Sequence, residues 1–267
     1  MNNLYTELAT VYEAMYQTFI DYKEEYHFYS EILKKYNKRE VVEIGCGTGN
    51  LAGYFLDEKY NYTGLDLSEE MINLAKEKSN GTFIKADMRD FKLQKKVESI
   101  IITARTISYL LISQDVNASF RSISDNIEKG GILAFDIIDA NRFVPMMAKD
   151  ENVEHQATFN NTNYIRKSTW RLQLTHGVDF LWDAIYYKED KDKPPRPENA
   201  SFYSYTLTTN LEYTFNPAKR KFLKYSLGMK DKFPDIRVTV APSQYADVDH
   251  AQYFTGNAVI EGLARSN

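Results

Sequence analysis

Three glycines occur at alternate positions, Gly45, Gly47 and Gly49, directly after the apolar stretch EVVEI. Glycine has no Cβ atom, so a ligand can approach the backbone closely at such positions. A glycine turn that ends a strand and opens a helix also presents unpaired N–H groups and a partial positive charge. The pattern therefore predicts a ligand-binding turn. Cys46 lies between two of the glycines and is expected to be a small spacing residue, not a nucleophile.

Three acidic residues accompany this turn. Glu43 precedes the glycines, Asp66 is next to last in the stretch YNYTGLDL, and Asp87 ends the stretch GTFIKAD. Dinucleotide-binding enzymes combine G-x-G-x-x-G with an acidic residue about 20 positions further on, which binds ribose hydroxyls. The spacing here is different, because one acidic residue is followed by G-x-G-x-G.

The elements that would position these residues alternate along the first half of the chain. Apolar strand-like stretches are separated by stretches with helical spacing, and Ser68 is the expected N-cap of one helix. This alternation predicts βαβ units and a parallel sheet. The predicted helices cover residues 4–36, 50–59, 68–81 and 113–131, and the predicted strands begin near residues 40, 60, 81, 97 and 131.

Taken in order, these stretches resemble the class I S-adenosylmethionine-dependent methyltransferases over residues 40–140. The resemblance implies that Asp66 holds the ribose diol, that Asp87 meets the adenine amino group and that Met88 packs beside the ring. The stretch IITARTISYL would deliver its backbone to the methionine end of the cofactor. Glu43 would orient the glycine turn or meet the cofactor's ammonium through water. The cofactor-binding residues implied are Tyr16, Glu43, Gly45, Cys46, Gly47, Gly49, Asp66, Leu67, Asp87, Met88, Thr103 and Ala104.

The same resemblance predicts the fold class and domains. We expect an α/β, Rossmann-like, seven-stranded and mostly parallel sheet with helices on both faces, and a small antiparallel β insertion. Strand-like aromatic and β-branched stretches dominate residues 152–213, whereas a capped helix at 216–228 and two more strands follow. The predicted domains are a helical lid at 1–38, a cofactor-binding core at 39–150 and 214–267, and the insertion at 151–213. The insertion would form a substrate wall or a homodimer interface, as in amino-sugar N-methyltransferases.

The N-terminal stretch ELATVYEAMYQTF resembles a lid segment, A-x-x-Y-D-x-x-F/M, of some of these enzymes, with Glu13 in place of the usual Asp. Tyr12 and Tyr16 are four residues apart and so share one face of a helix. They would cover the cationic sulfonium, or they are packing residues. Arg105 would receive a carboxylate or phosphate of the substrate, or is a surface charge. These three residues are the catalytic candidates, and no catalytic base is identified.

Composition restricts the other possibilities. The net charge of −4 argues against a broad nucleic-acid footprint, and no apolar run approaches the roughly 20 residues that span a bilayer. A single cysteine fits a reducing cytoplasm. The basic stretch AKRKFLKYSLGMKDK fits an amphipathic helix better than a nucleic-acid contact. His155, His176 and His250 are scattered and are expected to be structural or exposed.

The predicted function is methyl transfer from S-adenosylmethionine to a small molecule, most simply at an amine nitrogen, with S-adenosylhomocysteine as product and without a metal. An amine needs only to arrive uncharged, whereas an oxygen or carbon nucleophile usually demands a stronger base, and no His–Asp pair is evident. The alternatives are a small-molecule O-methyltransferase and an NAD-dependent oxidoreductase.

Overall fold

The structure is a computed structural model that describes residues 9–110, 112–136, 152–173, 179–189, 202–210, 237–241 and 257–261. The helix predicted at residues 216–228 lies outside the described residues, and so do His176 and His250.

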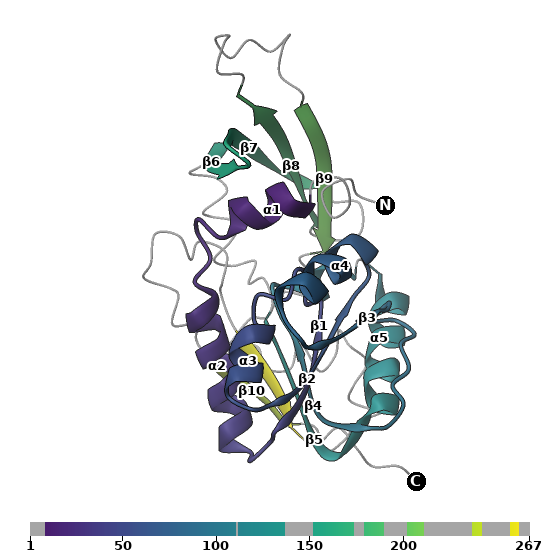
Figure 1. Ribbon diagram of the computed structural model, residues 1–267. Helices are drawn as coiled ribbons and strands as arrows, with labels where there is room; N and C mark the ends of the chain where they lie inside the picture. Colours follow the sequence, from purple (N-terminus) through teal and green to yellow (C-terminus); the bar gives the residue numbers. More distant parts are fainter. Residues whose placement is uncertain are drawn as a thin grey trace.

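Among the residues that the structure describes, the larger sheet has seven strands in the order β10-β11-β5-β4-β1-β2-β3 (Figure 1). β1 pairs in parallel with β2 and β4, β3 and β5 continue the parallel part, and β11 runs antiparallel to β5 and β10. This arrangement confirms the predicted α/β fold class. The strands are β1 (Glu40–Ile44), β2 (Asn61–Asp66), β3 (Thr82–Lys85), β4 (Val97–Ile102), β5 (Ile127–Asp136), β10 (Arg237–Ala241) and β11 (Asn257–Glu261).

The register of the parallel strands decides which residues meet at their carboxyl ends. Ile44 of β1 lies opposite Leu65 of β2 and Ile102 of β4, and Ile102 lies opposite Phe135 of β5. The residues that follow these four, Gly45, Asp66, Thr103 and Asp136, therefore share one edge of the sheet. In open α/β sheets this edge is where ligands bind.

Alternate side chains of each strand point to opposite faces of the sheet and form two cores. Val42, Ile100 and Leu133 belong to one core with side chains of α5, whereas Val41 and Ile101 belong to the other with side chains of α2, α3 and α4. Helices therefore cover both faces, with α2 and α3 opposite α5 (Figure 1). The helices are α1 (Ala9–Tyr16), α2 (Tyr22–Lys35), α3 (Ala52–Asp57), α4 (Glu69–Lys78) and α5 (Ser113–Asn126).

The structure corrects two predicted helix boundaries. The single helix predicted at residues 4–36 is two helices, because Asp21 caps α2 by accepting a hydrogen bond from the backbone N–H of Glu24. α5 ends at Asn126 and not at the following glycines, because β5 begins at Ile127 and includes both of them. The predicted cap of α4 is confirmed: the Ser68 hydroxyl accepts a hydrogen bond from the N–H of Met71.

The predicted antiparallel insertion is a four-stranded sheet in the order β6-β7-β8-β9. α1 lies between this sheet and the region of α4, and it contacts β6 and α4 (Figure 1). β9 contacts the short 3₁₀ helix η2 (Thr106–Tyr109) that follows β4. The smaller sheet thus stands over the carboxyl edge of the larger one. Its strands are β6 (Asn152–Phe159), β7 (Thr162–Gln173), β8 (Asp179–Lys188) and β9 (Phe202–Asn210).

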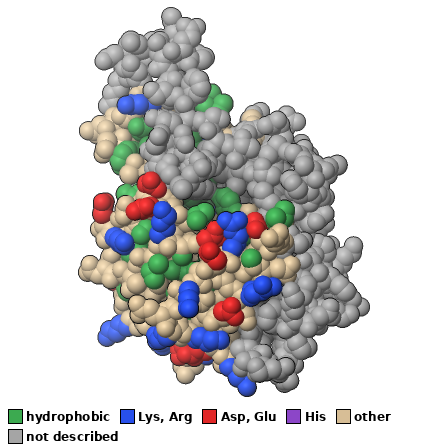
Figure 2. Space-filling model, turned by 90° about the vertical axis from the view of Figure 1, so that its right-hand side faces the viewer, with side chains coloured by type: hydrophobic (Ala, Val, Ile, Leu, Met, Phe, Trp, Pro, Cys, Tyr) green, Lys and Arg blue, Asp and Glu red, His purple; other side chains and the backbone are tan. Residues whose placement is uncertain are grey.

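Basic and acidic side chains are interspersed over the described part of the face seen in Figure 2, which is the right-hand side of Figure 1. Within the described ranges, no helix combines the length and the hydropathy that crossing a membrane requires.

Candidate functional site

The glycine turn (residues 45–50) follows β1 at the carboxyl edge of the sheet. The backbone N–H groups of Gly45 and Cys46 both donate to the carbonyl of Leu65, at 2.8 and 3.0 Å, so the turn is folded back on the end of β2. Gly45 and Gly47 have φ values of +77° and +53°. A Cβ atom at Gly45 would lie 2.3 Å from the hydroxyl oxygen of Thr106, whereas one at Gly47 would meet no atom of the described residues within 4 Å. Gly45 is therefore required by packing, and Gly47 faces open space.

Asp66 lies beside this open space. Its Oδ2 accepts a hydrogen bond from the N–H of Gly47 at 2.9 Å, and its Oδ1 accepts one from the N–H of Ser68 at 2.8 Å. The backbone of Leu67 also hydrogen-bonds to Asp66. A carboxylate has about four lone-pair positions, so these backbone bonds still leave acceptor capacity for a further donor. Burial raises the pKa of Asp66, and the backbone hydrogen bonds oppose that shift. The structure therefore places Asp66 and the glycine turn together, as predicted from the sequence.

Three further predicted residues lie near the ends of β2 and β3. Leu67 follows Asp66 and is 56% exposed, so its apolar side chain is accessible to a ligand. Met88 is half-buried and packs against the core shared with α5. Asp87 accepts hydrogen bonds from the Arg89 side chain on both oxygens, and these bonds hold the pKa of Asp87 below its usual value. An adenine amino group could reach the carboxylate of Asp87 only by replacing or sharing one of these bonds.

Glu43 and Cys46 point into the core beneath the glycine turn. Glu43 is 2% exposed and accepts hydrogen bonds from the hydroxyls of Tyr62 at 2.6 Å and Thr103 at 2.7 Å. Burial raises the pKa of Glu43 to about 7, although these two hydrogen bonds oppose the shift. Cys46 is buried, and burial raises the pKa of its thiol well above the usual value. Through these two hydrogen bonds, Glu43 of β1 is joined to Tyr62 of β2 and to Thr103 at the end of β4.

Residues 103–105, the β4 loop, contain two consecutive left-handed residues, Ala104 with φ +53° and Arg105 with φ +57°. Non-glycine residues adopt this conformation at a cost, and such strain collects at functional sites. The N–H of Arg105 donates to both carboxylate oxygens of Asp136, at 2.9 and 2.8 Å. Burial raises the pKa of Asp136 to about 6 and also raises that of Glu25, and the positive charge of Arg105 opposes both shifts, so its side chain acts on buried carboxyls of this edge.

Glu25, in the first turns of α2, was not predicted as a site residue. It is 5% exposed, and its Oε1 has no hydrogen-bond partner within the described part of the chain. Burial raises the pKa of Glu25 to about 8, with further contributions from Asp136 and Glu43; Arg105 and a hydrogen bond from the backbone of Ala104 oppose the shift. Nearby, the Tyr29 hydroxyl lies 3.3 Å from Asp136 Oδ1 and 3.3 Å from the Ile102 carbonyl.

The predicted lid residues lie between the two sheets. The rings of Tyr12 and Tyr16 are stacked with their centroids 3.9 Å apart. The guanidinium of Arg166, a buried residue of β7, lies 5.3 Å from the ring centre of Tyr16 and 5.1 Å from that of Phe19. The Nη2 of Arg166 is also 2.9 Å from Nδ1 of His155. α1 is therefore attached to the antiparallel sheet by aromatic and cation–π contacts.

A polar cluster attaches the other side of α1 to the glycine turn. The carboxylate of Glu13 accepts hydrogen bonds from Thr48, from Asn50 at 3.0 Å, from Gln17 at 2.8 Å and from the ammonium of Lys78. Burial acts to raise the pKa of Glu13, but the hydrogen bonds from Lys78, Thr48 and Gln17 outweigh it and lower the pKa. This Glu13 cluster connects α1, the glycine turn and the end of α4.

Sequence reasoning missed the roles of Glu25, Asp136 and Lys78. One signal was available for Glu25: helical spacing places it on the same face of α2 as Tyr22 and Tyr29, so an acidic residue interrupts an otherwise aromatic face. Asp136 and Lys78 carry no such signal, because only the register of the sheet and the packing of α1 bring them to the site.

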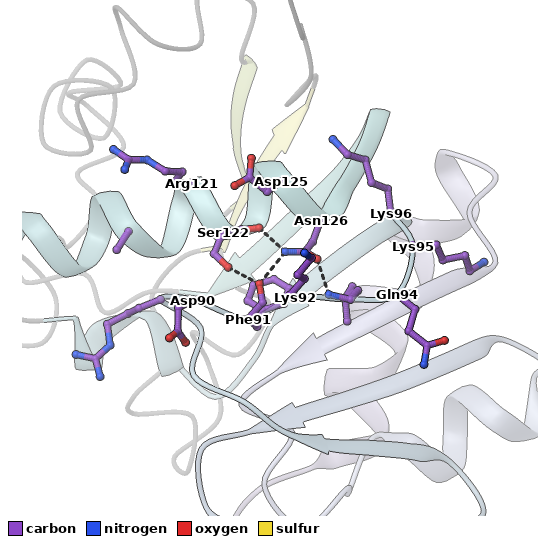
Figure 3. A pocket seen from close by; sticks show the side chains of 13 residues that line it. Asp90, Phe91, Lys92, Gln94, Lys95, Lys96, Arg121, Ser122, Asp125 and Asn126 are labelled. Atoms are coloured by element: carbon purple, nitrogen blue, oxygen red, sulfur yellow. Dashed lines mark hydrogen bonds between the residues drawn. The ribbon is translucent and has the colours of Figure 1, made fainter.

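A separate cavity of about 540 Å³ lies between residues 89–96 and α5 (Figure 3). The Asn126 side chain fixes this segment to α5: it donates to the carbonyl of Phe91 at 2.9 Å and accepts from the N–H of Leu93 at 2.7 Å. Ser122 also donates to the Phe91 carbonyl, at 2.9 Å. None of the residues predicted for the site lines this cavity, which is formed by the way one connection is attached to α5.

Comparison with known proteins identifies the family. Residues 41–131 match the methyltransferase domain family. An uncharacterized methyltransferase of Bacillus cytotoxicus is 31% identical over 160 residues, which are 57% of this chain and 73% of that protein. The dTDP-3-amino-3,4,6-trideoxy-alpha-D-glucopyranose N,N-dimethyltransferase of Streptomyces venezuelae is 29% identical over 97 residues, 36% of this chain and 41% of that protein. Two further methyltransferases are matched over 63% of their length, so the chain spans less than two thirds of these first relatives.

A solved structure shares the fold of this chain. The S-adenosylmethionine-bound structure of CalS10, an amino pentose methyltransferase from Micromonospora echinaspora, superimposes with a TM-score of 0.70 at 16% identity, over 94% of this chain and 96% of that chain. At this identity the likeness concerns the fold. The relative from Bacillus cytotoxicus, together with the matched domain, shows that the chain belongs to the methyltransferase family, and the shared fold agrees with the resemblance found in the sequence.

Proposed function

We propose that this chain binds S-adenosylmethionine at the carboxyl edge of the larger sheet and transfers its methyl group to an amine nitrogen of a small molecule. One observation carries the proposal: the open space beside the backbone of Gly47 lies next to Asp66, which keeps acceptor capacity after its backbone hydrogen bonds. A cofactor that carries a ribose diol fits both features, because the missing Cβ admits it and the carboxylate can accept from its hydroxyls.

The rest of the cofactor would extend in two directions from Asp66. The adenine ring would lie against the exposed Leu67 and the half-buried Met88, with Asp87 at its amino group. The methionine end would lie between the glycine turn and the β4 loop, where Thr103 and Ala104 present backbone groups, while Glu43 holds these strands from below. When bound, the cofactor supplies a methyl carbon attached to a positively charged sulfur. The contribution of the chain is then to align the acceptor and exclude water.

The acceptor would enter between α1, η2 and the antiparallel sheet. α1 is held on both sides, by Tyr16 against Arg166 and by Glu13 against the glycine turn, which suits a lid over the methionine end. The names of two similar proteins, an amino-sugar N,N-dimethyltransferase and an amino pentose methyltransferase, favour a nitrogen acceptor. Methylation of a hydroxyl oxygen is the alternative. A homodimer through the antiparallel sheet stays a prediction.

Calorimetric titration of the full chain tests the cofactor assignment. S-adenosylmethionine and S-adenosylhomocysteine are expected to bind, and NAD⁺ is not. The Asp66→Asn variant should bind S-adenosylhomocysteine at least about tenfold more weakly, since a hydrogen bond to a charged group contributes about 1.5–3 kcal/mol. Glu69→Gln, an exposed carboxyl nearby, is the matched control. Binding of NAD⁺ with no heat from either adenosyl compound would contradict the assignment.

Product analysis tests the acceptor. The chain would be incubated with methyl-labelled S-adenosylmethionine and a panel that pairs each amine with its hydroxyl analogue. Label recovered on nitrogen supports the proposal, and label confined to the hydroxyl analogues supports the O-methyltransferase alternative.

A further inference from the structure

Two residues of α2, one turn apart, connect the two loops that border the proposed methionine end of the site. Hydrogen bonding joins the Tyr22 side chain to Asn50 of the glycine turn, and it joins Glu25 to the backbone of Ala104 in the β4 loop. The carboxyl of Glu25 therefore lies where these loops approach each other.

One oxygen of the Glu25 carboxyl has no described hydrogen-bond partner although the residue is buried. Glu25 is 5% exposed, and Oε1 has no hydrogen-bond partner among the residues that the structure describes. A buried polar atom without a partner is rare in folded proteins, because leaving it unpaired costs about 1–3 kcal/mol. Asp136, only 2% exposed as well, differs in this respect: both of its oxygens accept from the N–H of Arg105. The open position on Glu25 is thus available to a donor from a ligand.

We propose that Glu25 is the proton acceptor for the methyl-accepting amine, and that the acceptor is an aliphatic amine that arrives as an ammonium ion. This inference rests on the proposed function. It goes beyond that function by naming the residue that handles the proton and by restricting the substrate to basic amines.

The chemistry follows from the charges around Glu25. Asp136 on β5 and Glu43 on β1 are acidic, Arg105 on the β4 loop is basic, and Tyr22 and Tyr29 of α2 also face this carboxyl. Carboxyls outnumber cations here, so an entering ammonium is favoured and displaces the proton of Glu25 to solvent. One N–H proton of the ammonium then passes to the carboxylate. The freed nitrogen lone pair forms the N–C bond to the methyl carbon as the C–S bond breaks, and the electron pair of that bond stays on sulfur.

The protonation behaviour of Glu25 agrees with this role. Its pKa is raised to about 8, so near neutral pH the carboxyl carries a proton that an ammonium can displace. A proton acceptor works best when its pKa lies near the working pH.

Sinefungin, in which a carbon-bound amine replaces the methyl group and sulfonium centre, provides a probe that needs no knowledge of the substrate. Its amine would lie beside Glu25, whereas S-adenosylhomocysteine has no group at this point. For the wild-type chain at pH 7, calorimetry in buffers of different ionisation enthalpy should show about one more proton released with sinefungin than with S-adenosylhomocysteine. The Glu25→Gln variant should lose this difference, and its preference for sinefungin over S-adenosylhomocysteine should fall at least about tenfold.

The Glu31→Gln variant, an exposed carboxyl of the same helix, is the matched control and should behave like wild type. Equal proton release with both compounds in the wild-type chain would overturn the proposal, whether or not Glu25→Gln folds. An unchanged preference for sinefungin in a folded Glu25→Gln variant would overturn it as well. If the proposed function itself is wrong, the wild-type chain should bind neither compound. That result is distinguishable from failure of the Glu25 proposal, in which both compounds bind.

Discussion

Alanine should affect mainly stability at one glycine of the turn and mainly ligand binding at another. Both Gly45 and Gly47 have positive φ, so alanine costs about 1–2 kcal/mol of folding free energy at either position. At Gly45 the new Cβ would also lie 2.3, 2.7 and 2.8 Å from three atoms of the Thr106 side chain. Rotating that side chain cannot relieve the contact, because one of the three atoms is the Cβ of Thr106. Overpacking of this kind adds about 1–3 kcal/mol, so Gly45→Ala is mainly a stability variant.

At Gly47 the new Cβ meets no protein atom within 4 Å and projects into the space proposed for the cofactor. Gly47→Ala should therefore lose little stability beyond the backbone cost. Its steric conflict with the cofactor should cost about 2–3 kcal/mol of binding free energy, which corresponds to roughly 30- to 150-fold weaker binding.

Denaturant unfolding and calorimetric titration with S-adenosylhomocysteine, both well below the thermal transition, separate the two effects. Gly53→Ala is the matched control, because its Cβ also meets nothing within 4 Å but Gly53 lies inside α3. There alanine should stabilise the fold by about 0.5–1 kcal/mol and leave binding unchanged. If Gly47→Ala binds S-adenosylhomocysteine within about twofold of wild type, the open space beside Gly47 is not the cofactor site.

Three further predictions concern the lid, the buried carboxyl under the turn and the single thiol. Glu13→Ala removes the hydrogen bonds that join α1 to the glycine turn, so calorimetry should show about tenfold weaker binding of S-adenosylhomocysteine, and unchanged affinity would contradict a lid held by Glu13. The pKa of Glu43 is raised from 4.5 to about 7, so between these pH values the folded chain retains a proton that the unfolded chain releases. The unfolding free energy should therefore fall as pH rises from 4.5 to 7, by up to about 1.4 kcal/mol per pH unit. In denaturant titrations, Glu43→Gln should flatten that slope. A steeper slope in the variant would refute the assignment. Cys46 is buried and the pKa of its thiol is raised, so the rate of its reaction with a colorimetric disulfide reagent should not exceed the rate at which the chain unfolds. Rapid labelling of the folded chain would show that the turn opens.

The sequence predicted well which residues meet at the carboxyl edge of the sheet, because the signals there are local. Gly45 and Gly47 have the positive φ values that glycine tolerates, and Ser68 caps α4 through its own hydroxyl. Asp66 could be assigned because it ends a strand next in order after the glycine turn, and neighbouring parallel strands bring their carboxyl ends together. Each of these inferences depends on a few consecutive residues and on one general rule of α/β folds.

The helix boundaries show where local signals compete. Continuous helical spacing across residues 4–36 concealed the break at Asp21, because an aspartate can lie on the polar face of a helix or cap the next one. Similarly, the glycines after α5 fit a helix end, but pairing with β4 and β11 draws residues 127–136 into the sheet. A local capping hydrogen bond at Asp21 decided the first case, and tertiary strand pairing decided the second.

By itself, the sequence determined the family, the glycine turn and the order of the elements, because these follow from residue types at fixed short spacings. Only the tertiary structure brought Glu25 of α2, Asp136 of β5 and the left-handed Ala104 and Arg105 of the β4 loop together. These residues are up to 111 positions apart in the sequence (136 − 25 = 111). The pKa of Glu25 depends on burial and on charges contributed by other elements. The unfilled hydrogen-bond position on its carboxyl depends on how α2 packs against those elements. Neither property exists until the sheet register and the packing of α2 are set.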